Sequence, residues 1–226
     1  MPDIQHIVLI TAFYPPDRHA GAELGTRFIA RAACQRGHRV TVIVTRPDPK
    51  NRDRYETRDG AIEMVWLSTI NLPFLRFFGE LLFASLAIRR LKPDRIHGQC
   101  LLPAAFLAGF WGRRLKIPST AYLYGNDVSQ VSTFMRLTFA RAALSRCEQI
   151  FAASAWCADL AEALPPYRTA IIRYSGFDDR HFSPDTIDGE SIADVSASDH
   201  ILLFVGRLID DKAVDVLIDA VAILAS

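Results

Sequence analysis

The chain has 226 residues, half of them hydrophobic, and a formal net charge of +1 at pH 7. This length and composition allow one large or two small globular domains with a sizeable core. The near balance of 26 basic and 25 acidic residues argues against a nucleic-acid-binding module, which would need clustered lysine and arginine.

The four cysteines, Cys34, Cys100, Cys147 and Cys157, show no C-x-x-C spacing and no accompanying His-x-x-x-His. We therefore expect free buried thiols in a reducing compartment and no zinc site. The N-terminus enters the apolar run 7–10 without a basic segment, and that run is too short for a signal peptide. These features predict a cytoplasmic protein.

The N-terminal part has the pattern of a strand, a helix and a second strand. Residues 7–11 form an apolar run, a helix is expected from Glu23, and Gly37 stands where a left-handed helix cap is expected. The β-branched residues in 38–45 are typical of a strand covered on both faces. This βαβ pattern predicts a Rossmann-like α/β fold, a parallel sheet with helices on both faces.

The loop after the first strand argues against a dinucleotide site. It contains two prolines within residues 14–16 and then Gly21 and Gly25, instead of Gly-x-Gly-x-x-Gly directly after the strand. An NAD-dependent oxidoreductase is therefore a weak alternative. Glu23 has two interpretations, an acid that favours the positive end of the helix dipole or a residue that faces a ligand.

The alternation of strands and helices continues to residue 174. Residues 47–60 are charged and loop-like, Ser154 is the expected N-cap of a helix, and Pro165-Pro166 ends that helix. Strands are expected at residues 62–67, 93–99, 120–124, 149–153 and 169–174, and helices at 73–91, 103–115 and 134–145.

The helix expected at residues 73–91 is apolar almost all round. Its uninterrupted apolar segment, 81–88, is far shorter than the roughly 20 residues that a bilayer requires. By default it packs on the sheet. As an alternative it contacts an anionic membrane surface from the inner face, because basic residues stand near both ends. These are Arg76, Arg89, Arg90 and Lys92.

Polar residues follow two of the expected strands. In open parallel sheets ligands bind beyond the carboxyl ends of the strands, which would suit His97 and the segment 124–127. A histidine at a strand end is more often a satisfied structural residue. Glycine and polar residues such as Asn126 and Asp127 are turn formers first and site residues second.

The C-terminal residues predict a further strand, turn and helix. Residues 201–205 read as a buried strand, and apolar residues recur at helical spacing in 214–224. The turn between them carries Arg207 and Lys212, near a helix N-terminus that favours an anion. The sequence leaves a phosphate site and an ordinary solvated pair of cations as alternatives.

The acidic, small-residue stretch 185–199 is interpreted as a linker. We therefore predict an acceptor-side Rossmann-like domain over residues 1–184 and the first βα unit of an incomplete second domain over 200–226. A lone βα unit leaves strand edges and an apolar helix face uncovered. Hence the last strand is expected to pair with the first sheet, or the chain to be truncated, or a second chain to supply the rest.

Several of these stretches resemble motifs of the family four retaining glycosyltransferases, which have the GT-B fold. Residues 204–208 with Lys212 resemble the opening of the nucleotide-sugar-binding domain of that family. Residues 14–42 resemble the start of its acceptor domain, and residues 175–184 resemble its hinge signature. The resemblance is therefore spread over most of the chain.

The chain departs from the family pattern at four positions. Ala213 and Ala20 stand where the family has glycine. Gln99 replaces the second histidine of an Asp-x-x-His-x-His motif, and Tyr124 replaces the histidine of His-Gly-x-Asp, whose Asp127 is present. A tyrosine can donate a hydrogen bond but is protonated at neutral pH unless its pKa is strongly shifted.

The resemblance implies hexosyl transfer from a nucleotide-diphosphate sugar to a glycan or lipid acceptor. The nucleotide sugar is a substrate, and no cofactor or metal is implied. The family's paired-glutamate motif is absent, so no catalytic set is complete and the chain is expected to be inactive alone. The alternative is a module that binds an acceptor or partner without catalysis. The resemblance assigns the donor diphosphate to Arg207, Lys212 and Gly21, and the acceptor-side cleft to Glu23, His97, Tyr124, Asn126 and Asp127.

Overall fold

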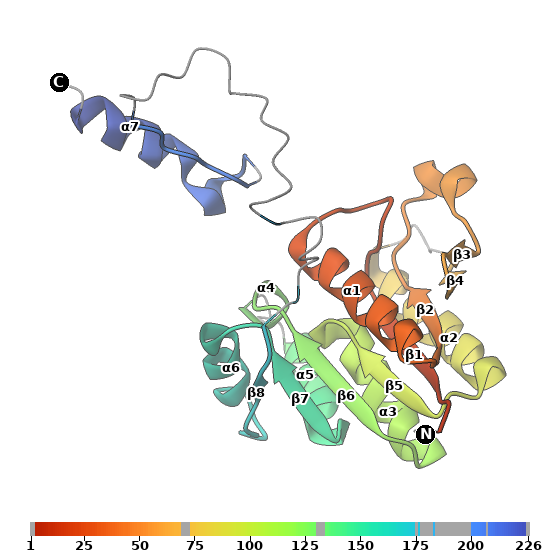
Figure 1. Ribbon diagram of the computed structural model, residues 1–226. Coiled ribbons are helices and arrows are strands. Elements are labelled where there is room, and N and C mark those ends of the chain that lie inside the picture. The colour runs from red at the N-terminus through yellow and green to blue at the C-terminus, as the bar shows by residue number, and fades with distance from the viewer. Residues whose placement is uncertain are drawn as a thin grey trace. The chain divides into compact units, whose positions relative to one another are not determined.

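The computed structural model describes residues 3–68, 73–129, 134–174, 176, 183, 200–206 and 208–224. The chain divides into two units, Met1–Asp179 and Arg180–Ser226. We describe each unit by itself (Figure 1).

The first unit is built on one eight-stranded sheet with the order β3-β4-β2-β1-β5-β6-β7-β8. Neighbouring strands are parallel except β3 and β4, which are antiparallel. The carboxyl ends of the parallel strands therefore share one edge of the sheet. The strands are β1 (His6–Thr11), β2 (Arg39–Val44), β3 (Arg58–Asp59), β4 (Ile62–Trp66), β5 (Arg95–Gly98), β6 (Ser119–Leu123), β7 (Gln149–Ala152) and β8 (Ile171–Ile172).

Helices cover both faces of this sheet, as the sequence predicted (Figure 1). Successive side chains of β1 point to opposite faces. Leu9 is therefore in a core with α1, whereas Val8 is in a core with α2, α3, α5 and α6. The helices are α1 (Gly21–Gln35), α2 (Pro73–Leu91), α3 (Phe106–Leu115), α4 (Asn126–Ser129), α5 (Phe134–Arg146) and α6 (Ala155–Glu162).

The connection from β5 to α3 is unusually close. A Cβ atom at Gly98 would lie 2.4 Å from the backbone nitrogen of Ala105, so only glycine fits at this position. The helix predicted at residues 103–115 begins differently from the prediction. Leu101–Ala105 form a π-helical turn with extended backbone at Leu102, and the regular helix starts at Phe106.

The segment 47–60, predicted as a loop, contains two short elements. Pro49–Arg54 form a 3-10 helix, and β3 makes a hairpin with β4 through Gly60, whose φ is +61°. A two-residue strand is too short to produce a hydrophobic alternation. The sequence therefore gave no sign of it.

The second unit contains a 3-10 turn, Asp210–Lys212, and the helix α7 (Val214–Leu224). The helix agrees with the prediction, but the predicted strand at residues 201–205 is wrong. These residues form no strand, and Leu203 and Val205 are more than 80% exposed. A strand needs a neighbouring strand for its backbone hydrogen bonds, and apolar sequence alone does not supply one.

Candidate functional site

The carboxyl edge of the sheet is organised by the carboxylate of Asp127, at the start of α4. One oxygen accepts a hydrogen bond from the backbone N–H of Leu101 at 2.7 Å. The other accepts from the N–H groups of Tyr124 at 3.1 Å and Gly125 at 2.9 Å. Burial raises the pKa of Asp127 more than these N–H groups lower it. The carboxylate therefore ties the loop after β5 to the loop after β6.

Tyr124 and Gln99, the two residues that replace family histidines, are bonded to each other. The Tyr124 hydroxyl donates to the side-chain oxygen of Gln99 at 3.1 Å, and Gln99 is almost fully buried. Burial raises the pKa of Tyr124 strongly, against the effect of a hydrogen bond with Thr26 of α1. Tyr124 is therefore a neutral donor at physiological pH. No local sequence pattern predicts this contact.

The start of α1 lies after the loop that leaves β1, and it contains Gly21 and Glu23. A Cβ atom added at Gly21 would meet no described atom within 4 Å, so there is open space beside its backbone. Glu23 is 8% exposed, and its Oε2 has no hydrogen-bond partner among the described residues. A buried polar atom without a partner is uncommon, and such atoms often mark a place for water or a ligand.

His97 lies inside β5, in register with Leu9 of β1 and Thr120 of β6. Its imidazole is hydrogen-bonded to the Thr120 hydroxyl. Burial, with a smaller effect of the Arg95 charge, lowers the pKa of His97 to about 4. In the described structure no hydrogen bond joins His97 to Tyr124 or Asp127. Its role in a cleft stays a prediction.

The remaining predicted residues belong to both units of the chain. Asn126 is exposed at the first position of α4. Lys212 is exposed and ends the 3-10 turn before α7. Arg207 lies outside the described residues, so its pairing with Lys212 stays a prediction. Ala213, where the family has glycine, has a φ of +47°, the left-handed conformation that glycine adopts most readily.

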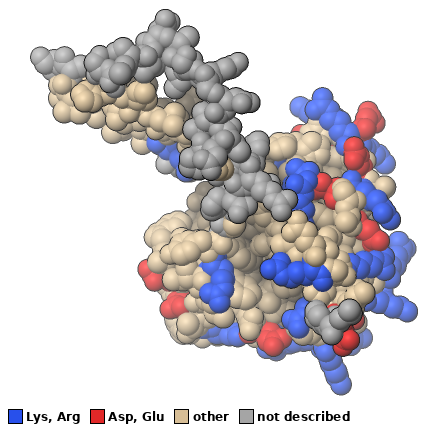
Figure 2. Space-filling view, in the orientation of Figure 1, with Lys and Arg blue, Asp and Glu red and all other residues tan. Residues whose placement is uncertain are grey.

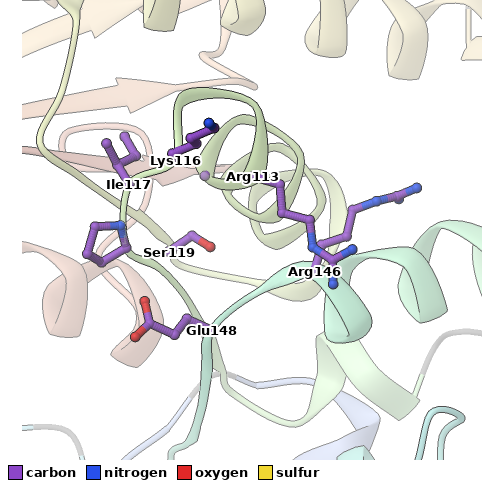
Figure 3. A pocket seen from close by; sticks show the side chains of 8 residues that line it. Arg113, Lys116, Ile117, Ser119, Arg146 and Glu148 are labelled. Atoms are coloured by element: carbon purple, nitrogen blue, oxygen red, sulfur yellow. The ribbon is translucent and has the colours of Figure 1, made fainter.

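A cavity of about 350 Å³ lies at the other edge of the sheet, before β6 and β7. Figure 3 shows Arg113 of α3 and Arg146 of α5 on one side of it and Glu148 on the other. Arg113 donates to the backbone oxygen of Ser145 at 2.6 Å. Cations at helix C-termini are expected on electrostatic grounds alone, so this cavity is not our candidate site.

The family model for Glycosyltransferase Family 4 matches residues 19–178. A search of curated protein sequences gives no match.

Solved structures share the fold. Sucrose-phosphate synthase from Thermosynechococcus elongatus has a TM-score of 0.60 and 17% identity, over 80% of this chain and 50% of that chain. Anabaena HepE in complex with UDP-glucose has a TM-score of 0.57 and 16% identity, over 80% and 47%. Another solved structure of the Thermosynechococcus sucrose-phosphate synthase, with a shorter chain, has a TM-score of 0.52 and 14% identity, over 77% of this chain and 90% of that chain. The present chain spans about half the length of the first two.

Replacing Asp127 by asparagine should lower the free energy of unfolding by about 2 kcal/mol, because an amide NH2 group must then face a backbone N–H. Urea unfolding of the variant measures this. Asp159→Asn, at an exposed position of α6, is the matched control and should leave the midpoint unchanged. Equal midpoints for both variants would show that Asp127 does not hold the loops.

The lowered pKa of His97 predicts acid-sensitive stability. The unfolded chain takes up this proton near pH 6.5 but the folded chain only near pH 4, so the contribution of His97 is present above pH 6.5 and is lost as the pH falls to 4. Burial also lowers the pKa of His6, which acts in the same direction. Thermal unfolding of His97→Gln should depend less on pH over this range than that of the wild type. His200→Gln, at an exposed position, should not differ from the wild type.

Proposed function

Because the chain belongs to glycosyltransferase family 4, we propose that it contributes the acceptor-side unit of a retaining enzyme that transfers a hexosyl group from a nucleotide-diphosphate sugar to a glycan or lipid. The family match over residues 19–178, all of it in the first unit, is the observation that carries this proposal. The fold shared with a protein solved with UDP-glucose supports it.

The acceptor-side role is supported by the carboxyl edge of the first unit. The unpartnered Oε2 of Glu23 is suited to accept a hydrogen bond from a sugar hydroxyl. Asn126 offers an exposed amide at the same edge. Tyr124 and Asp127 use their polar groups to hold the loops, so in this proposal they position the cleft and leave acceptor contact to Glu23 and Asn126.

The proposed donor-side role rests on two cationic residues and on the open space beside Gly21. Negative charge develops on the leaving diphosphate, and fixed positive groups stabilise it. We propose Arg207 and Lys212 as these groups. The open space at Gly21 lets a phosphate approach the N-terminus of α1, whose free N–H groups favour an anion.

We expect Lys212→Ala and Arg207→Ala, each introduced into the full-length protein that the cell produces, to raise the KM for the nucleotide sugar and lower kcat. We expect kcat/KM to fall about 100-fold, the usual effect of removing one group that stabilises transition-state charge. The measurement is transfer of labelled sugar from nucleotide sugars to glycan and lipid acceptors. Lys50→Ala, exposed in the 3-10 helix of the first unit, is the control. Unchanged kinetics in both variants would exclude the donor-side assignment.

We also propose that the first unit contacts an anionic membrane surface through α2 and α3. No helix in the described part of the chain is long and apolar enough to cross a bilayer. However, α2 exposes an apolar stripe at helical spacing, with 46% of Leu75, 57% of Leu82 and 41% of Leu86 exposed. Phe110 of α3, which packs against α2, is 42% exposed. A helix with an exposed apolar stripe suits the interface of a bilayer.

The exposed charged side chains of the described parts of α2 and α3 are all basic. The acidic residue of α2, Glu80, is buried and paired with Arg46 at 2.6 Å. The visible face of the first unit in Figure 2 contrasts with this, because basic and acidic side chains are intermixed there. The exposed basic residues of α2, α3 and their C-terminal ends are Arg76, Arg89, Arg90, Lys92, Arg113, Arg114 and Lys116.

The double substitution Leu82→Ser/Leu86→Ser should reduce binding to vesicles that contain phosphatidylglycerol about tenfold. Membrane binding removes both leucine side chains from water, and serine loses this favourable contribution. Vesicle sedimentation measures this, and high salt should weaken binding of the wild type. Ile4→Ser, at a position 77% exposed outside α2, is the matched control. Binding that is unaffected by the double substitution would contradict the proposed membrane contact.

A further inference from the structure

A second cavity, of about 350 Å³, lies within the first unit between the loop after β1, helix α1 and the β3–β4 hairpin. This volume is in the range of small-molecule sites. The cavity is lined by Tyr14, Pro15, Pro16, His19, Arg27, Arg54, Glu56, Arg58, Asp59, Gly60, Met64 and Trp66.

One wall of the cavity contains a hydrogen-bonded network centred on Asp59. Its carboxylate accepts from Arg27 at 2.6 and 2.7 Å and from the Tyr14 hydroxyl at 2.9 Å. Arg31 adds an ion pair at 3.3 Å. Burial alone would raise the pKa of Asp59, but the hydrogen bonds from Arg27 and Tyr14 hold it below its usual value. Both oxygens of Asp59 are therefore already paired, and Asp59 does not balance the charge of the other cations of the cavity.

A second wall is aromatic and fixed in place. The indole N–H of Trp66 donates to the backbone oxygen of Glu56 at 2.8 Å. Tyr55 stacks on Trp66 with ring centroids 4.1 Å apart but is not among the lining residues, so the cavity borders another part of the indole. Tyr14 meets Trp66 edge to face at 6.4 Å.

Two guanidinium groups in the lining are left without an acidic partner. Arg54, from the 3-10 helix, and Arg58, from β3, are exposed and form no ion pair with any described residue. Glu56 is an acid in the lining besides Asp59, and no ion pair is formed by it within the described ranges. The cavity thus combines two available guanidinium groups, one available carboxylate and an aromatic wall.

We propose that this cavity binds an acidic saccharide, and that it is the subsite for an acceptor that carries a carboxylate or a phosphate. This inference rests on the proposed function. The apolar face of a sugar ring packs on the part of Trp66 that borders the cavity. The paired N–H groups of Arg54 and Arg58 match the geometry of a carboxylate or a phosphate. Glu56 accepts hydrogen bonds from sugar hydroxyls.

The location of the cavity favours an acceptor over an unrelated ligand. Pro15, Pro16 and His19 belong to the loop that leads directly into Gly21 and Glu23 at the start of α1. A saccharide anchored on Arg54 and Arg58 is therefore held beside the loop that forms the proposed acceptor side.

Isothermal titration of the 226-residue chain with glucuronate, glucose 6-phosphate, glucose and inorganic phosphate tests the inference. We expect at least one of the two acidic sugars to bind ten times more tightly than both glucose and inorganic phosphate. Preference for glucuronate or for glucose 6-phosphate identifies the acidic group as a carboxylate or a phosphate. Arg54→Ala and Arg58→Ala should each reduce the affinity for that sugar about tenfold.

Arg52→Ala is the matched control, because Arg52 is exposed in the same 3-10 helix and does not line the cavity. Equal losses in all three variants, equal affinity for glucose, or equal affinity for inorganic phosphate would overturn the inference. Thermal unfolding verifies that the variants are folded. Titration of the chain needs no transfer. Acidic-sugar binding by the chain, with no sugar transfer by the full-length protein that the cell makes, would reject the proposed function, whereas transfer to neutral acceptors without acidic-sugar binding would reject this inference alone.

Discussion

The carboxylate of Asp127 is the constraint on which the candidate site depends. The loops at the carboxyl edge of a parallel sheet belong to separate βα units, and each presents backbone N–H groups that need acceptors. Asp127 supplies one acceptor set to both the π-helical turn after β5 and the turn after β6. With these two loops fixed, the Tyr124 hydroxyl meets Gln99, and the two replacements of family histidines form one contact. The substitutions are therefore understood as a pair.

The sheet separates two kinds of surface. On the α1 side, the Oε2 of Glu23 has no partner among the described residues, and Asp59 and its partners border a cavity of about 350 Å³. On the other side, α2 and α3 combine exposed leucine side chains with cations and keep their acid, Glu80, buried. Because different helices cover the two faces of the sheet, the proposed saccharide site and the proposed membrane contact lie on opposite sides of one domain.

Sequence periodicity was sufficient for the architecture of the first unit because strands and helices there repeat with clear alternation. Periodicity did not predict features that depend on contacts between residues far apart in the sequence. Residues 201–205 are apolar enough for a buried strand, but no described strand pairs with them. Gln99 and Tyr124 are 25 residues apart, and no local sequence pattern predicts their contact. For Arg207 and Lys212, the helix N-terminus left an anion site as one alternative, and the role in binding the donor diphosphate came from the family resemblance. No geometry of the described residues tests the two as a pair.

The glycines at residues 21 and 98 are held by different requirements. At Gly98 the protein's own backbone excludes a side chain, whereas at Gly21 no described atom does. In a population of variants selected only for folded protein, alanine would accumulate at position 21 and be eliminated at position 98. Selection for a ligand that approaches α1 would be needed to keep the first glycine. The difference between the two selections would therefore separate the sequence demands of the fold from those of the chemistry.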